Sequence, residues 1–221
     1  MTFFLCIPEY EAEGYKFEFI TVSDIVKSVK KRFSEIDSYQ ANFKIETKRL
    51  EAKNVQHGII KYKTSDKLLV NFHNPYGLKI ISDGKTMWIY IPSMNVVAEQ
   101  DLQVESGSLF FSQTKSGLSR LFSKYHYKFA TKEQPELQKD GTKKYTLLLK
   151  QRESRSGYRT LKLWIREDYI ITKAHGDTST GKSVDIEFSN INTDINHPKG
   201  IFKFNIPSKA RIIKNPIVSE E

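Results

Sequence analysis

The chain has 221 residues, of which 38% are hydrophobic and 28% charged, so it is long enough to bury a sizeable hydrophobic core. No apolar run approaches the roughly 18 residues of a membrane-spanning helix, and the single cysteine, Cys6, excludes an internal disulfide framework and zinc sites built on paired cysteines. The net charge of +9 favours an anionic partner, such as nucleic acid, a membrane surface or an acidic protein.

Residues 1–19 are expected to form an N-terminal tail, either a signal remnant or a leader, ahead of a single domain over 20–221. The short apolar stretch Phe3–Ile7 has no Lys or Arg before it, and no small-residue cleavage site follows it. This segment therefore does not match a complete secretory signal.

An amphipathic helix is predicted from Ser23 to about Ser38, with Ser23 or Asp24 as its N-cap. Apolar residues recur at steps of three and four, at Ile25, Val26, Val29, Phe33 and Ile36. Lysines and an arginine occupy the other side, so one face is expected to be buried.

From Phe43 onward the hydrophobic period changes to two, which is typical of strands with one buried face. Asp83-Gly84 is a two-residue hairpin motif between two such strands, and a last short strand is expected over Phe202–Asn205. Consecutive strands joined by turns, without a βαβ rhythm or an internal repeat, predict an antiparallel meander. The strands expected before the last lie near Phe43–Ile45, Ile60–Tyr62, Val70–Phe72, Leu78–Ile81, Lys85–Ile91, Tyr145–Lys150, Tyr158–Arg166, Tyr169–His175 and Ser183–Asn190.

One or two short helices with a strongly apolar face interrupt this pattern between Gly107 and Tyr127. Two interpretations are open for this segment: a helix that fills the core of a sheet, or a lid over a cavity. The candidate lid residues are Leu109, Phe110, Leu118, Leu121, Phe122 and Tyr125.

Residues 176–183 match the P-loop pattern G-x-x-x-x-G-K-[ST]. A working P-loop opens a helix, whose N-terminus faces the phosphates. Here the residues that follow, Val184–Ser189, alternate as a strand does, so we interpret the motif as a polar hairpin loop.

The residues give little support to an enzyme, and no cofactor or metal is expected. The five histidines are far apart and lack metal-binding spacing, there is no G-x-S-x-G motif, and Cys6 lies in the expected tail.

The segment 143–166 holds eight basic residues against one acidic residue, Glu153. It is either a solvated face or a contact surface for a membrane or an acidic partner. A β-rich module that binds nucleic acid is the alternative function, although few aromatic residues alternate with these cations as stacking platforms would require. The candidate contact residues are Lys150, Arg152, Arg155 and Arg159.

Four segments carry a resemblance to the LolA family of periplasmic lipoprotein carriers, over about Val22–Ile213. The predicted helix leads into Ser38-Tyr39-Gln40-Ala41-Asn42-Phe43, and Gly58-Ile59-Ile60 begins the next strand. A D-G-K turn followed by W-x-Y and a proline lies within Ser82–Pro92, and Phe202–Pro207 is similar to the family's F-x-F-x-x-P ending.

The resemblance implies a mainly β (α+β) fold, an incomplete antiparallel β-barrel of about 9–11 strands with an N-terminal helix and short lid helices over an apolar cavity. It also implies a periplasmic protein that carries acylated lipoproteins from the inner to the outer membrane. The implied partners are an inner-membrane lipoprotein-releasing transporter, an outer-membrane acceptor and, transiently, a membrane surface. The family's Arg-Pro after the second strand is replaced by Thr64-Ser65, which either removes the family's lid-closing arginine or leaves its role to Lys63.

An acyl-chain carrier needs binding rather than catalysis, because each buried methylene contributes about 0.8 kcal/mol. Strand parity predicts which side chains would line the cavity, and it is least certain for the strand over Thr86–Ile91, whose two faces are equally apolar. The predicted acyl-binding residues are Phe43, Ile45, Ile60, Tyr62, Val70, Phe72, Trp88, Tyr90, Leu147, Leu149, Leu161, Leu163, Ile165, Val184, Ile186 and Phe188.

Overall fold

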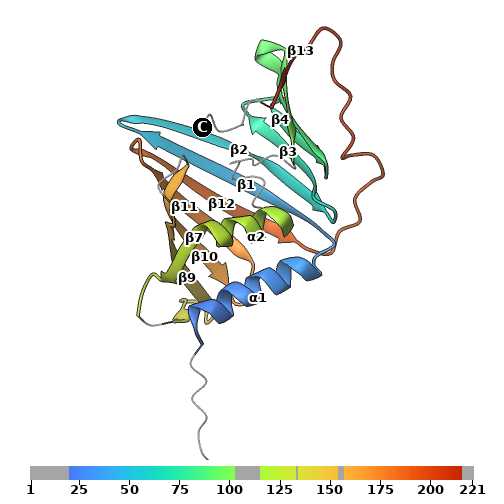
Figure 1. Ribbon diagram of the computed structural model, residues 1–221. Helices are drawn as coiled ribbons and strands as arrows, with labels where there is room; N and C mark the ends of the chain where they lie inside the picture. Colours follow the sequence, from blue (N-terminus) through green and yellow to red (C-terminus); the bar gives the residue numbers. More distant parts are fainter. Residues whose placement is uncertain (1–19, 103–114, 133, 154–156, 216–221) are drawn as a thin grey trace, which may run out of the picture.

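The computed structural model describes residues 20–102, 115–132, 134–153 and 157–215. One large twisted sheet curves around two helices, α1 (Val22–Glu35) and α2 (Lys115–Lys124), which lie across its concave face (Figure 1). Of the helices that the structure describes, none is long and apolar enough to cross a membrane.

The sheet contains thirteen strands in the described residues, in the order β13-β6-β5-β4-β3-β2-β1-β12-β11-β10-β9-β7, with β8 paired to β9. Pairing is antiparallel except between β13 and β6. The two outer strands do not meet, so the barrel is incomplete, as predicted. The strands are β1 (Ser38–Arg49), β2 (Ala52–Lys63), β3 (Lys67–Asn74), β4 (Lys79–Asp83), β5 (Thr86–Ile91), β6 (Val96–Asp101), β7 (Tyr125–Phe129), β8 (Glu136–Leu137), β9 (Lys143–Gln151), β10 (Tyr158–Arg166), β11 (Ile171–Thr178), β12 (Lys182–Asn192) and β13 (Arg211–Lys214), and a 3-10 turn, η1 (Pro92–Met94), lies between β5 and β6.

Helix α1 begins one residue before the predicted start. Thr21, rather than Ser23 or Asp24, is the N-cap: its hydroxyl accepts a hydrogen bond from the Asp24 amide at 3.2 Å, while the Asp24 carboxylate accepts one from the Thr21 amide at 3.1 Å. This reciprocal capping box fixes the first turn. The helix ends at Glu35 because Ile36 already has an extended backbone.

Helix α1 and the inward side chains of the strands form one continuous hydrophobic cluster. Ile25, Val26, Val29 and Phe33 provide the buried stripe of α1, as the sequence periodicity predicts. The inward side chains come from both halves of the sheet, since β1 pairs with β2 on one side and β12 on the other. The core therefore lies between the concave face and the two helices.

The C-terminal segment contradicts one strand prediction. Residues 202–205 form no strand, and the strand near this end is β13, which pairs with the edge strand β6. The Phe204 ring lies 6.1 Å from the rings of both Trp88 and Tyr90 on β5, so it covers the outer face of the sheet. The period-two pattern here reflects an extended segment packed on a sheet, not a strand within it (Figure 1).

A buried histidine fastens this segment to the sheet. The His197 side chain is 6% exposed, and its Nε2 lies 3.1 Å from the backbone carbonyl oxygens of both Tyr39 and Tyr62. Because both partners are acceptors, the ring donates from Nε2. The T-shaped contact with Phe202 holds the other side of the ring.

Replacing Gly58 on β2 with alanine is expected to lower the free energy of unfolding by about 1–3 kcal/mol through overpacking. A Cβ at this position would lie 2.1 Å from the Asn71 carbonyl oxygen, a backbone atom that cannot move away by itself. Gly176→Ala is the matched control, because the nearest atoms there belong to the side chains of Tyr158 and Leu161, which can shift. Urea denaturation should show the larger loss for Gly58→Ala, and equal losses would contradict this explanation.

Candidate functional site

The concave face is the candidate site, because the structure gathers most of the predicted inward side chains there. Fourteen of the sixteen belong to the buried hydrophobic cluster beneath the helices. They are Phe43, Ile45, Ile60, Tyr62, Val70, Phe72, Leu147, Leu149, Leu161, Leu163, Ile165, Val184, Ile186 and Phe188.

The prediction for Trp88 and Tyr90 is wrong, because both lie on the opposite face of β5. Met87 is fully buried in the cluster and Ile89 packs against it. The register agrees with this parity, since Ile89 pairs with Ile80, which belongs to the cluster, whereas Trp88 pairs with Ile81, which does not. The sequence could not separate the two faces because both are covered, one by the core and the other by the C-terminal segment.

Helix α2 covers one side of the concave face. Leu118 and Phe122 are buried, each 2% exposed, and Leu121 is half-buried against the cluster. Tyr125 was expected to continue the helix, but it begins β7 instead. Two further candidate lid residues, Leu109 and Phe110, lie outside the described residues.

Beyond its apolar face, α2 makes aromatic, cation–π and polar contacts with its neighbours in the described part of the chain. The Phe122 ring meets the Tyr127 ring edge-on at 6.1 Å, and the Lys30 ammonium of α1 lies 5.8 Å from the centroid of the Phe122 ring. The Arg120 guanidinium donates weakly to the Leu102 carbonyl at 3.4 and 3.5 Å.

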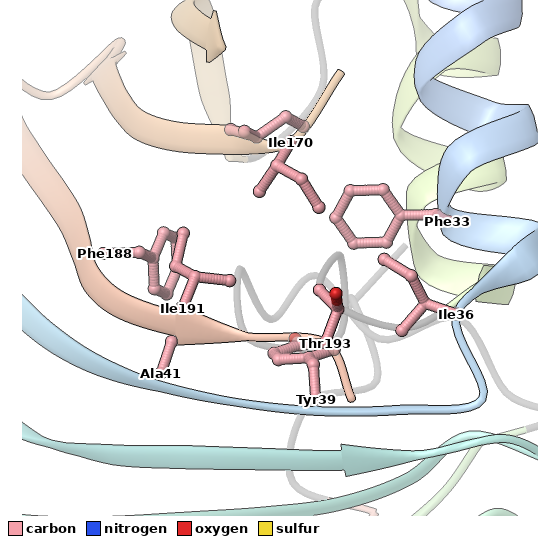
Figure 2. A pocket seen from close by; sticks show the side chains of 9 residues that line it. Phe33, Ile36, Tyr39, Ala41, Ile170, Phe188, Ile191 and Thr193 are labelled. Atoms are coloured by element: carbon pink, nitrogen blue, oxygen red, sulfur yellow. The ribbon is translucent and has the colours of Figure 1, made fainter. Parts of the chain in front are cut away.

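A pocket opens between the C-terminal end of α1 and the sheet (Figure 2). It contains about 300 Å³ of free space, including its opening to solvent. In the close-up, Phe33 of α1 and Ile36, just after this helix, point toward Ile170, and Tyr39, Ala41, Phe188 and Ile191 rise from β1 and β12. Ile171 at the start of β11 and Thr193 just after β12 complete the lining. The pocket is lined by Phe33, Ile36, Tyr39, Ala41, Ile170, Ile171, Phe188, Ile191 and Thr193.

Sequence reasoning identified only Phe188 among these pocket residues as a ligand contact. Phe33 and Ile36 were assigned to the helix face, and Tyr39 and Ala41 share the parity of Phe43 on β1, which could have found them. Ile170 comes from the turn between β10 and β11, where no periodic pattern points inward.

The tyrosine hydroxyls of this region are neutral at physiological pH. Burial raises the pKa of Tyr39 well above its usual value, and the neighbouring Tyr62 ring, stacked at 5.3 Å, adds to the effect. Burial likewise raises the pKa of Tyr125 to about 12, and its hydroxyl donates to the Tyr158 carbonyl at 2.7 Å. Such a surface suits an apolar ligand, since it presents neutral groups and carbon atoms.

The predicted basic contact residues lie at one end of β9 and β10. Lys150, Arg152 and Arg159 are exposed, and the Arg152 Nε also donates to the Tyr125 carbonyl at 3.3 Å; Arg155 lies outside the described residues. Lys63 is exposed on β2, with the opposite parity to the buried Tyr62. Its side chain therefore faces away from the concave face, and it is not placed to hold α2 closed.

The P-loop match forms a hairpin, as the alternation after it predicts. Residues 176–183 comprise the end of β11, a turn and the start of β12. Gly181 adopts a left-handed backbone with φ of +75° in that turn. Because the motif opens a strand, it lacks the helix N-terminus that phosphate binding requires.

An open antiparallel sheet wrapped around two helices places the chain in the fold class of the LolA-like proteins. The family model for the outer membrane lipoprotein carrier protein LolA matches residues 34–205, and the chain belongs to this family. It is 21% identical over 195 residues to outer-membrane lipoprotein carrier proteins of Neisseria meningitidis, which covers 86% of this chain and 87% of the relative.

A solved structure with a TM-score above 0.5 agrees with this fold. A conserved protein from Thermus thermophilus superposes with a TM-score of 0.57 at 13% identity, over 87% of this chain and 98% of that one. A LolA superfamily protein from Nitrosomonas europaea matches with a TM-score of 0.46 at 16% identity, over 84% of this chain and 99% of that one.

Proposed function

We propose that this protein is a carrier that binds the acyl chains of lipoproteins between the concave face of the sheet and its two helices. The observation that carries the proposal is the continuous apolar face, built from strands in both halves of the sheet and covered by α1 and α2. The family and the names of the Neisseria meningitidis relatives support lipoproteins as the cargo.

Binding requires α2 to move, because the side chains beneath it are closely packed. Leu118 and Phe122 occupy space that an acyl chain would fill, and Leu147 and Leu149 on β9 are fully buried. An entering chain would replace these contacts with its own at about 0.8 kcal/mol per methylene. The pocket beside α1 would receive at most a small part of the chain, because its volume of about 300 Å³ includes open solvent.

The proposed transport route leads from the inner to the outer membrane. The carrier would act in the periplasm, receive lipoproteins from an inner-membrane releasing transporter and deliver them to an outer-membrane acceptor. The names of the relatives support this direction. Exposed Lys150, Arg152 and Arg159 would make transient contact with the membrane surface or with an acidic partner, since each cation near an anionic bilayer contributes about 1 kcal/mol.

A triacylated lipopeptide and the same peptide without acyl chains test the proposal directly. Isothermal titration should show saturable one-to-one binding of the acylated form with a negative heat-capacity change, because apolar surface is buried. The deacylated peptide should not bind. Equal binding of both peptides, or of neither, would contradict the proposal. Lipoproteins found by native mass spectrometry of the purified chain would identify the cargo.

A further inference from the structure

Leu50 has the most exposed large hydrophobic side chain among the described residues. It lies at the tip of the hairpin between β1 and β2, and its side chain is 96% exposed. This tip lies at one end of the sheet, beside the turn between β11 and β12 (Figure 1). A single exposed leucine needs no explanation by itself, but its conformation and its neighbours set this one apart.

The backbone of Leu50 has a left-handed conformation that side-chain-bearing residues rarely adopt. Its φ is +54°, and the hairpin turn consists of Leu50 and Glu51, because Arg49 pairs with Ala52. Glycine or asparagine is the usual residue at such a position. A leucine here contributes no packing and strains the turn, so folding stability does not explain its presence.

One of the two pairs of facing cations near the tip is also unfavourable for the isolated protein, because no carboxylate bridges Arg49 and Lys182 among the described contacts. Arg49 on β1 lies directly opposite Lys182 on β12, and Lys48 lies directly opposite Lys53 on β2. Like charges at directly opposed strand positions repel each other. Glu46 bridges the second pair, at 3.0 Å from Lys48 and 2.8 Å from Lys53.

The basic hairpin formed by β9 and β10 has its turn at the same end of the sheet. Tyr158 pairs with Thr178 and Thr160 with Lys150, so the turn between β9 and β10 lies at the end of the sheet that carries the β1–β2 tip. Arg152 and Arg159 extend the cationic rim there. Acidic residues are fewer along this rim, with Glu51, Glu153 and Asp177 exposed.

We infer that the β1–β2 tip is a docking element for an anionic lipid bilayer, with Leu50 inserted among the acyl chains and the surrounding cations bound to headgroups. A protruding apolar side chain within a basic rim fits this surface, because the bilayer offers hydrocarbon below a layer of negative charge. The bilayer would relieve both unfavourable features, since it buries Leu50 and its headgroups neutralise the facing pair Arg49 and Lys182.

Co-sedimentation with vesicles tests this inference without acylated cargo. The docking inference can therefore fail while the carrier proposal stands, and the carrier proposal can fail while the docking inference stands. The wild-type chain should bind vesicles of equal parts phosphatidylcholine and phosphatidylglycerol, bind phosphatidylcholine alone more weakly, and dissociate as salt is raised. Leu50→Asn should weaken binding roughly ten- to hundredfold, the equivalent of one buried leucine. Its melting temperature should be unchanged or higher, because asparagine tolerates the left-handed turn.

Two controls distinguish insertion of Leu50 from nonspecific binding to vesicles. Leu137 is 72% exposed on β8, which pairs with the start of β9 at the opposite end of the sheet, and Leu137→Asn should leave vesicle binding unchanged. The double variant Arg49→Gln/Lys182→Gln should lose binding by about tenfold or more, whereas Lys85→Gln/Lys139→Gln, at exposed turns elsewhere, should not. Vesicle binding by Leu50→Asn equal to that of the wild type, or no binding by the wild type, would overturn the inference.

Discussion

Leu121→Glu is expected to reduce the affinity for a triacylated lipopeptide by at least about tenfold, while the melting temperature changes by only a few degrees. Leu121 is half-buried on α2 and packs against the edge of the core cluster. In the empty protein a carboxylate there can reach water, so the fold tolerates it. Beside a bound acyl chain it would lose that water, which an unpaired carboxylate cannot do without a large penalty. Titration calorimetry and thermal unfolding measure the two effects separately.

Ser119→Glu is the matched control for this variant, since Ser119 lies on the exposed side of the same helix. It adds the same charge without placing it against the core, and lipopeptide binding should match that of the wild type. A fall of the melting temperature by ten degrees or more in Leu121→Glu would instead identify α2 as a permanent part of the core. Unchanged binding in Leu121→Glu would remove α2 from the binding site.

Ile191→Trp is expected to lower lipopeptide affinity by about tenfold by filling the pocket beside α1. Ile191 on β12 lines this pocket and is only half-buried, so a larger ring can occupy the free space without overpacking the core. The affinity falls because each methylene of the acyl chain that the ring displaces from the pocket no longer contributes its roughly 0.8 kcal/mol of binding free energy. Calorimetric titration checks the affinity, and a near-unchanged urea midpoint checks the fold.

Ser189→Trp provides the comparison, because Ser189 lies on the same strand but is exposed. It carries the same ring on the solvent side, so affinity should not change. If both variants bind like the wild type, the pocket is not part of the binding site, and only the space beneath α2 remains for the cargo.

Local patterns predicted most of the sheet and most of the inward side chains. Strands with one covered face alternate strictly, as in β1 and β10, and their parity follows directly from the sequence. Helix α1 was equally clear, because one stripe is buried and the other solvated. The alternation of residues after the P-loop match predicts a strand, and the structure confirms this strand as β12.

The failures occur where tertiary contacts replace local pattern. Strand β5 is apolar on both faces because Phe204 packs on its outer side, so parity could not be assigned. Strands β8 and β13 have two and four residues, which are too few for a periodic pattern. Strand β6 directly follows the 3-10 turn η1, and β7 directly follows helix α2, so neither strand has a clear start in the sequence. The pocket joins residues of α1, β1, β11, β12 and the adjoining turns, and no local pattern brings such distant residues together.

Photo-crosslinking at adjacent positions of β7 tests the central claim most directly. A photoreactive phenylalanine at Tyr127, which packs against the core cluster, and another at Lys128, which is exposed on the opposite face, differ by a single residue in the chain. With acylated lipopeptide bound, we expect crosslinks to the acyl chains from position 127 and none from position 128. Equal crosslinking at the two positions, or crosslinking from position 128 alone, would contradict binding within the concave face.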